Sequence, residues 1–179
     1  GQPARISSLT RDVVYHFRLF EFNGSGATVN YNTNAAAGNP ISQTTMPATP
    51  RSAASNLTVS AIGAQPFTVT WTKGATGTNT LIVIRAGAAP SGPTDMNSYA
   101  ADPVFGSGSD LGSGSYVVYT NTGTSVTVTG LTPGTRYYIK AYAFNGGGGS
   151  ENYRTSDPPS TDAYTLMPEP TTQASGIGF

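Results

Sequence analysis

The stretch "LTPGTRYYIKAYAFNG", Leu131 to Gly146, decides the fold, and it has an earlier counterpart in the same chain. "LTRDVVYHFRLFEFNG", Leu9 to Gly24, stands 122 positions before it and keeps Leu, Thr, Tyr, Phe, Asn and Gly in register. Downstream, "GSGATVNYNT" aligns with "GGGGSENYRT" at the same offset. Of the 25 aligned pairs from Leu9/Leu131 to Thr33/Thr155, ten are identical. A fixed internal period of this kind indicates repeated structural modules.

Composition limits the function classes open to this chain. Of its 179 residues only 10% are charged and the net charge is zero, against about 25% charged residues in typical globular domains. No basic run offers an electrostatic footprint for nucleic acid or a polybasic membrane anchor. The longest apolar run, Leu81 to Ile84, is far shorter than the ~20 residues of a membrane helix. We therefore expect neither nucleic-acid binding nor membrane insertion.

Two further features of the composition concern compartment and chemistry. The chain contains no cysteine, which excludes disulfides and cysteine-ligated zinc. Threonine, serine, glycine and asparagine stand where charged residues usually would. This composition favours an exported protein, located outside the cell or on its surface.

Apolar residues alternate with threonines in several short runs. In "PFTVTWT" the side chains of Phe67, Val69 and Trp71 fall on one face and threonines on the other, the period of a half-buried strand. "LIVIRAG", "SYVVYT" and "RYYIKAYAF" are apolar or aromatic on both faces, which predicts better-covered strands. Turn-rich segments such as "KGATGTN" and "NTGT" separate them. The predicted fold is all-β, with antiparallel sheets packed face to face.

A second repeat marks where the modules begin. "MPATPRSAASNLTV", from Met46, resembles "MPEPTTQASGIGF", from Met167. We therefore expect residues 1–45 to be the C-terminal part of a first module and residues 46–166 to be a complete module. Residues 167–179 would then be the first strand of a third, so that the modules stand in tandem.

The first, partial module should repeat only the last strands of the complete one. "ARISS" aligns with Val126–Gly130, "YHFRLFEF" aligns with Tyr137–Phe144, and a final strand is expected near Ile41–Thr45. Half a sandwich exposes an apolar face and unpaired strand edges. We expect neighbouring modules of a longer polypeptide to cover it, and strand exchange between copies is the alternative.

The complete module resembles a fibronectin type III domain. A proline-rich entry, "PATP", leads to a first strand with Leu57, and Trp71 stands where the family keeps its core tryptophan. The family motif L-x-P-x-T-x-Y is present as Leu131, Pro133, Thr135 and Tyr137. The resemblance implies an immunoglobulin-like β-sandwich in which Tyr137 closes a corner between two strands through its hydroxyl.

The chain departs from the family pattern in two places. In the partial module only Leu9 and Tyr15 of the motif remain, because Arg11 and Val13 replace proline and threonine. In the complete module residues 87–115 form a long insertion. With that insertion, the module resembles those found in tandem in large secreted or surface proteins of Bacteroidetes.

No constellation of reactive side chains is evident, and we expect no enzyme activity, no cofactor and no metal site. His16, the single histidine, is expected on the solvent face of its strand. Asp95, Asp102 and Asp110 lie in the insertion, but their spacing matches no calcium-loop pattern. Loop-capping roles are the favoured interpretation, and a bound calcium ion is the alternative.

Four aromatic residues near the insertion leave two interpretations open. Tyr99, Phe105, Tyr116 and Tyr119 could form a ligand surface for a glycan. A long loop with aromatic residues at intervals is more often packed than free, and we favour rings that cover the sheet.

The resulting hypothesis is a non-catalytic spacer or stalk segment of a long extracellular or cell-surface protein. The alternatives are an adhesion or carbohydrate-binding module with a glycan or protein partner, an accessory segment of a secreted hydrolase, and a subunit of an extracellular filament.

Overall fold

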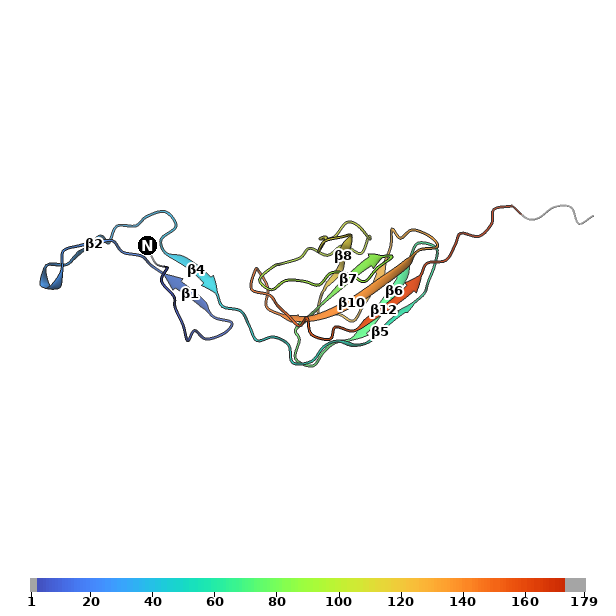
Figure 1. The fold of residues 1–179 in the computed structure, drawn as a ribbon, viewed down its shortest axis with the longest axis horizontal. Helices are drawn as coiled ribbons and strands as arrows, with labels where there is room; N and C mark the ends of the chain where they lie inside the picture. The colour runs from blue at the N-terminus through green and yellow to red at the C-terminus, as the bar shows by residue number, and fades with distance from the viewer. Residues whose placement is uncertain (1–2, 173–179) are drawn as a thin grey trace, which may run out of the picture. The chain divides into compact units, whose positions relative to one another are not determined.

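The computed structural model describes residues 3–172, which fall into two compact units. Unit 1 comprises Gly1–Ala48 and unit 2 comprises Thr49–Phe179. Figure 1 shows the strands of both, and each unit is described by itself. Among the described residues there is no α-helix, and the only helical turn is the 3-10 segment η1, Gly26–Thr28.

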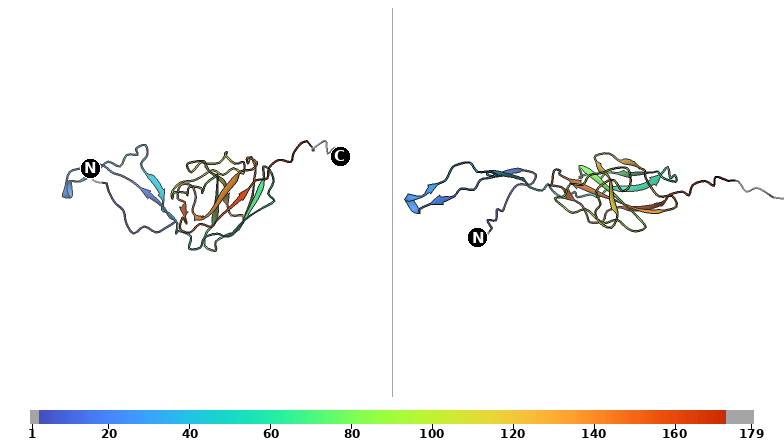
Figure 2. Two further views of the ribbon diagram at one scale, coloured as in Figure 1. Left: turned by 45° about the vertical axis from the view of Figure 1, so that its right-hand side comes forward. Right: turned by 90° about the horizontal axis from the view of Figure 1, so that it is seen from above.

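Unit 2 is a sandwich of two antiparallel sheets, which confirms the predicted all-β fibronectin type III fold (Figure 2). The smaller sheet has the order β5 (Ser55–Ser60), β6 (Phe67–Thr72), β9 (Ser125–Val128). The larger sheet has the order β11 (Asn152–Tyr153), β10 (Arg136–Asn145), β7 (Asn79–Ala86), β8 (Ser115–Asn121), and β12 (Ser160–Tyr164) also pairs with β10.

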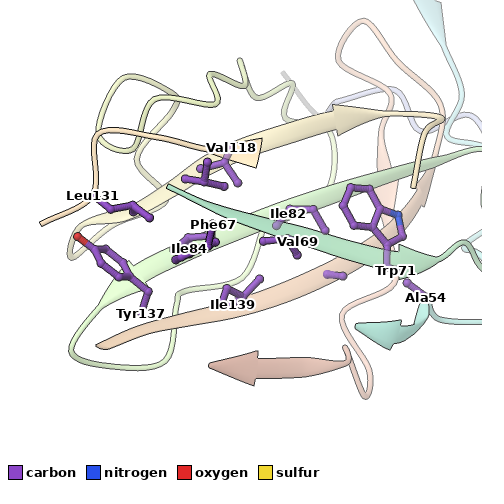
Figure 3. Packing of buried hydrophobic residues seen from close by; sticks show 12 residues of the cluster. Ala54, Phe67, Val69, Trp71, Ile82, Ile84, Val118, Leu131, Tyr137 and Ile139 are labelled. Atoms are coloured by element: carbon purple, nitrogen blue, oxygen red, sulfur yellow. The ribbon is translucent and has the colours of Figure 1, made fainter. Parts of the chain in front are cut away.

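The core lies between the two sheets (Figure 3). Phe67, Val69 and Trp71 of β6 share one buried cluster with side chains of β7 and β10. The alternating threonines of the smaller sheet face outward and pair across strands, as the hydroxyls of Thr68 and Thr127 do at 3.0 Å. The period-two pattern therefore places apolar residues inside and hydroxyls outside.

Part of the larger sheet is buried on both faces, because the chain between β7 and β8 folds back over its second face. A second cluster on that face contains Leu81, Val83, Val117, Tyr142, Phe144 and Tyr153, with Tyr99 and Leu111 packed against it. This explains why β7 and β10 are apolar on both sides.

Unit 1 has two small antiparallel sheets and a largely exposed set of apolar side chains. β1 (Val14–Phe17) pairs with β4 (Ile41–Thr44), and β2 (Phe22–Asn23) pairs with β3 (Asn30–Tyr31). Large hydrophobic residues from 40% to 78% exposed are Ile6, Val14, Leu19, Phe20, Phe22, Tyr31 and Ile41.

Two strands expected in unit 1 are corrected by the structure. Residues 4–8 form no strand, and the stretch expected as one strand over 15–22 is interrupted at 18–21. Their counterparts in unit 2 are held by hydrogen-bonded neighbours, β9 by β6 and β10 by β7. The described part of unit 1 contains no equivalent of β6 or β7. Of the expected third-module strand, residues 167–172 form none and 173–179 lie outside the described residues.

Candidate functional site

The motif L-x-P-x-T-x-Y builds a corner at the start of β10. The backbone N–H of Thr132 donates to the hydroxyl oxygen of Tyr137 at 2.8 Å. The ring of Tyr137 is 1% exposed and meets Phe67 and Phe105 edge-on, with centroid distances of 6.0 and 5.0 Å. A buried phenol is thus satisfied at its polar end while its ring fills the core.

A threonine just after β12 completes this corner. The hydroxyl of Thr165, a 3% exposed residue, donates to the carbonyl of Thr132 at 2.7 Å and accepts from the N–H of Thr135 at 3.0 Å. The N–H of Thr165 donates to the carbonyl of Thr135 at 3.0 Å. One side chain therefore ties the end of β12 to both sides of the turn, a role that the sequence motif did not indicate.

Unit 1 contains the same corner. The N–H of Thr10 donates to the hydroxyl of Tyr15 at 2.8 Å. The hydroxyl of Thr45 donates to the carbonyl of Thr10 at 2.6 Å and accepts from the N–H of Val13 at 3.1 Å. The corner forms although Arg11 and Val13 replace proline and threonine, because the bonds at those positions use backbone atoms.

The backbone of the corner also repeats its left-handed residues. Gly130 and Gly134 have φ of 70° and 66°, and the residues 122 positions earlier, Ser8 and Asp12, have φ of 60° and 58°. A positive φ is unfavourable for a residue with a Cβ. Two non-glycine residues hold this conformation in unit 1, so the repeat preserves a specific backbone geometry and not only a sequence pattern.

The other predicted core residues lie around this corner and at the far end of β6. Leu131 and Trp71 are 3% and 4% exposed, whereas Pro133 and Leu9 are half-buried. The buried Nε1 of Trp71 makes no hydrogen bond with the described residues. Its ring meets Tyr119 edge-on at 4.9 Å.

The four aromatic residues proposed as a ligand surface lie in separate packing groups. Tyr99 contacts Tyr153 at 5.9 Å, Phe105 contacts Tyr116 at 5.2 Å, and Tyr119 contacts Trp71. All four are half-buried, and Tyr99, Phe105 and Tyr119 pack against the two cores. Tyr99 and Phe105 attach the insertion to the sandwich, whereas Tyr116 and Tyr119 belong to β8, and the four rings do not form one platform.

A different group of polar and aromatic side chains lies on the outer surface of β10 and β12. The guanidinium of Arg136 binds the carboxylate of Asp162 at 2.8 Å and lies 4.8 Å from the ring centre of Tyr138 and 5.5 Å from that of Tyr164. The hydrogen bond from Arg136 lowers the pKa of the Asp162 carboxyl. Sequence patterns alone do not reveal this group, since its members come together only when β10 and β12 pair.

Beside it is a hollow of about 230 Å³, lined by Ala89, Pro90, Tyr138, Ile139, Lys140, Ser160, Thr161 and Asp162. The ammonium group of Lys140 makes no ion pair with any described residue. The hollow therefore offers an aromatic ring, an ammonium group and hydroxyl groups.

The acidic residues of the insertion cap backbone groups. Asp95 accepts from the N–H of Tyr153, Asp102 from Val104, and Asp110 from Gly112 and Ser115. Within residues 3–172 no three histidine, aspartate or glutamate side chains are grouped as metal ligands would be.

The single histidine occupies the position expected for it. His16 is exposed on β1, and its Nδ1 lies 2.7 Å from the hydroxyl of Ser42.

In the part of the chain that the structure describes, no helix has the length and hydropathy needed to span a membrane.

Comparisons with known proteins give similar structures and a matching family model. Structures similar to this chain include the fn3 domain of human contactin 1 (14% identity, 85% of this chain and 100% of that chain, TM-score 0.46). A second is the fibronectin type III domain of the human KIAA0970 protein (16% identity, 73% of this chain and 88% of that chain, TM-score 0.44). A third is domains d3–d4 of the rat CD45 extracellular region (15% identity, 92% of this chain and 70% of that chain, TM-score 0.43). No curated protein matches the chain. The family model for the fibronectin type III domain matches residues 50–159, and the chain belongs to this family.

Proposed function

We propose that this chain is a non-catalytic spacer or stalk segment of an extracellular or cell-surface protein, with neighbouring modules of the same polypeptide as its main partners. The observation that carries this proposal is the corner built twice, by Thr132 and Tyr137 in unit 2 and by Thr10 and Tyr15 in unit 1. Repetition of one structural unit along a chain adds length without adding a reactive site.

The path of the chain through unit 2 supports the same function. The chain enters the sandwich at one end and leaves β12 at the opposite end (Figure 1 and Figure 2). A module threaded in this way holds its two attachment points apart by its own length. The antiparallel pairing of β10 with both β7 and β12 resists extension, because their hydrogen bonds must break before the sheet opens.

Single-molecule pulling on the full chain tests the spacer function. Unit 2 is expected to resist force as one cooperative body and then lengthen by roughly 400 Å, at about 3.6 Å per extended residue. A Tyr164→Phe variant, altered at an exposed ring, should unfold at the same force. Gradual extension of unit 2 without a resisting event would contradict the proposal.

A second candidate function is binding of a glycan, because of the hollow beside Tyr138. The tyrosine ring offers a surface for a sugar face, the Lys140 ammonium offers a partner for a sugar carboxylate, and Ser160 offers a hydroxyl. Arg136 lies over the ring of Tyr138 and binds Asp162, which fixes two neighbouring side chains. An acidic sugar such as a uronic acid matches this combination better than a neutral one.

Titration with uronic-acid and neutral trisaccharides tests the second candidate. Uronate binding should weaken about tenfold in Lys140→Gln, the loss of one charge-assisted bond of about 1.4 kcal/mol. Lys73→Gln, the same change on a lysine that bonds the carbonyl of Thr78, should leave it unchanged. Equal loss in both variants, or no uronate binding at millimolar concentration, would reject the glycan candidate and leave the spacer function.

The accessory-segment and filament hypotheses depend on polypeptide or copies beyond this chain. They stay predictions.

A further inference from the structure

Unit 1 reproduces the pairing of the last strands of unit 2. β1 pairs with β4 so that Tyr15 lies opposite Gln43, as Tyr137 lies opposite Ala163. β2 and β3 place Phe22 opposite Tyr31, as β10 and β11 place Phe144 opposite Tyr153. Even the bond from the N–H of Asn32 to the carbonyl of Glu21, 2.8 Å, has its counterpart from Arg154 to Ala143, 2.9 Å. Unit 1 thus has the architecture of β10, β11 and β12.

Unit 2 shows what this architecture packs against when it is covered. β10 pairs along its second edge with β7, residue by residue from Tyr137 to Phe144. The inner face of β10 lies in one core with β6. On this inner face Ala141 is 0% exposed, whereas its counterpart Leu19 is 78% exposed. Phe144 and Tyr153 lie on the other face, where Tyr99 and Leu111 pack, and they are 5% and 3% exposed, against 59% and 58% for Phe22 and Tyr31. The exposed face of unit 1 corresponds to a face that is buried in unit 2.

Unit 1 also has room for covering side chains. A hollow of about 640 Å³ is lined by thirteen residues, among them Ile6, Phe17, Leu19, Ile41 and the small residues 36–38. Most of these residues are apolar or small. A hollow of this size accommodates several aliphatic side chains, which is what one face of a strand supplies.

The interruption at residues 18–21 marks the missing neighbour. β10 continues through the equivalent positions, 140–143, because β7 pairs with each of them. In unit 1 the N–H of Leu19 donates to the Asn39 side chain at 2.9 Å and the Asn39 amide donates to the Leu19 carbonyl at 2.6 Å, on the β4 side, where the equivalent Ala141 N–H of unit 2 donates to the Pro159 carbonyl at 3.1 Å. The opposite edge of residues 18–21, which corresponds to the edge paired with β7 in unit 2, has no strand partner among the described residues of unit 1.

We propose that the exposed face of unit 1 is a docking surface for two antiparallel strands of the same polypeptide, with the apolar patterns of β6 and β7. One strand pairs with the free edge of β1 and extends it through residues 14–23. The other places its apolar face on Tyr15 and Phe17. This inference stands whether or not the chain acts as a spacer.

Unit 2, in which β10 is covered, indicates where the docking strands come from. In unit 2 the strands that cover β10 belong to the same chain and precede β10 in sequence. Strands linked to their docking surface need no intermolecular encounter, and the linkage raises their effective concentration. They also remove the unpaired edge of β1, which would otherwise invite association between molecules.

An extended chain tests this proposal. A second copy of residues 46–122 is placed directly before Gly1, so that the repeat offset of 122 continues without a gap. The amide protons of residues 14–23 are then expected to exchange at least about 100-fold more slowly than in the parent chain. A second version carries Phe17→Ile and Leu19→Ala, which restores the residues of unit 2 at these positions and avoids overpacking.

The control is the same extension with Val69→Asp and Ile84→Asp in its added copy, which should give no protection. The amides of β10 report in every case that unit 2 stays folded. The proposal is overturned if neither extended chain protects residues 14–23. It is also overturned if the parent chain already protects them in a dimer, which would make a second copy the partner, or if unlinked residues 46–122 protect them equally well at micromolar concentration.

Discussion

The hydroxyl of Tyr137 and the backbone nitrogen of Thr132 lie 2.8 Å apart, and the same distance separates Tyr15 from Thr10. In unit 2 this bond closes a turn whose aromatic ring is buried, and in unit 1 the ring is only half-buried. The corner is therefore a local structure that forms with or without a complete core around it, and it can be tested in both places.

Removing the hydroxyl of Tyr137 should destabilise unit 2. Tyr137→Phe leaves the N–H of Thr132 without its acceptor, and the expected cost is about 1–2 kcal/mol of unfolding free energy. Tyr164→Phe, which alters a 59% exposed ring, should stay within about 0.5 kcal/mol. Chemical denaturation measures both, and equal effects would show that the corner bond contributes nothing.

The hydroxyl of Thr165 should stabilise unit 2 about as much as the hydroxyl of Tyr137 does. Thr165→Val keeps the shape of the side chain but leaves the carbonyl of Thr132 and the N–H of Thr135 without their shared partner, a loss of about 1–3 kcal/mol. Thr122→Val, at an exposed threonine in the turn between β8 and β9, is the matched control. A neutral Thr165→Val variant would mean that water replaces both bonds.

Trp71 should stabilise unit 2 because its ring fills space in the core. Trp71→Ala removes a ring that is 4% exposed and contacts Tyr119, and large deletions of this kind cost about 3–5 kcal/mol. Thermal or denaturant unfolding gives the value. A cost under about 1 kcal/mol would contradict the placement of Trp71 in the core.

The insertion should depend on the absence of a side chain at Gly108. A Cβ there would lie 2.0 Å from the carbonyl oxygen of Val117 on β8, so Gly108→Ala must displace the insertion from the strand, at about 1–3 kcal/mol. Gly147→Ala is the control, since its Cβ meets nothing within 4 Å. Similar stabilities for the two variants would show that the insertion packs elsewhere.

Stability should fall in alkaline solution. Burial raises the pKa of Tyr142 from 10.0 to about 12 and also raises the pKa of Tyr153. The unfolded chain therefore releases these protons at a lower pH than the folded chain. Stability is intact below pH 10 and decreases as the pH rises from 10 towards 12. Melting temperatures across this range should fall less steeply in Tyr142→Phe, and parallel curves would refute the assignment.

Much of this molecule follows from local sequence. Alternation of apolar residues with threonine specifies which side of β6 is buried, because neighbouring side chains of a strand point to opposite faces. The motif from Leu131 to Tyr137 specifies the corner, because its atoms lie within six positions of one another and need no distant partner. The repeat at an offset of 122 indicated a second corner, and the bond between Thr10 and Tyr15 is that corner.

Other features depended on residues far apart in the chain. Thr165 reaches Thr132 across 33 positions, the rings of Tyr99 and Phe105 pack on strands outside the insertion, and Arg136 meets Asp162 only through strand pairing. Residues 4–8 and 18–21 have strand-like counterparts in unit 2 but form no strand in unit 1. The physical reason is the same throughout: a strand persists only where a neighbour satisfies its backbone hydrogen bonds, and the tertiary structure decides which segments have that neighbour.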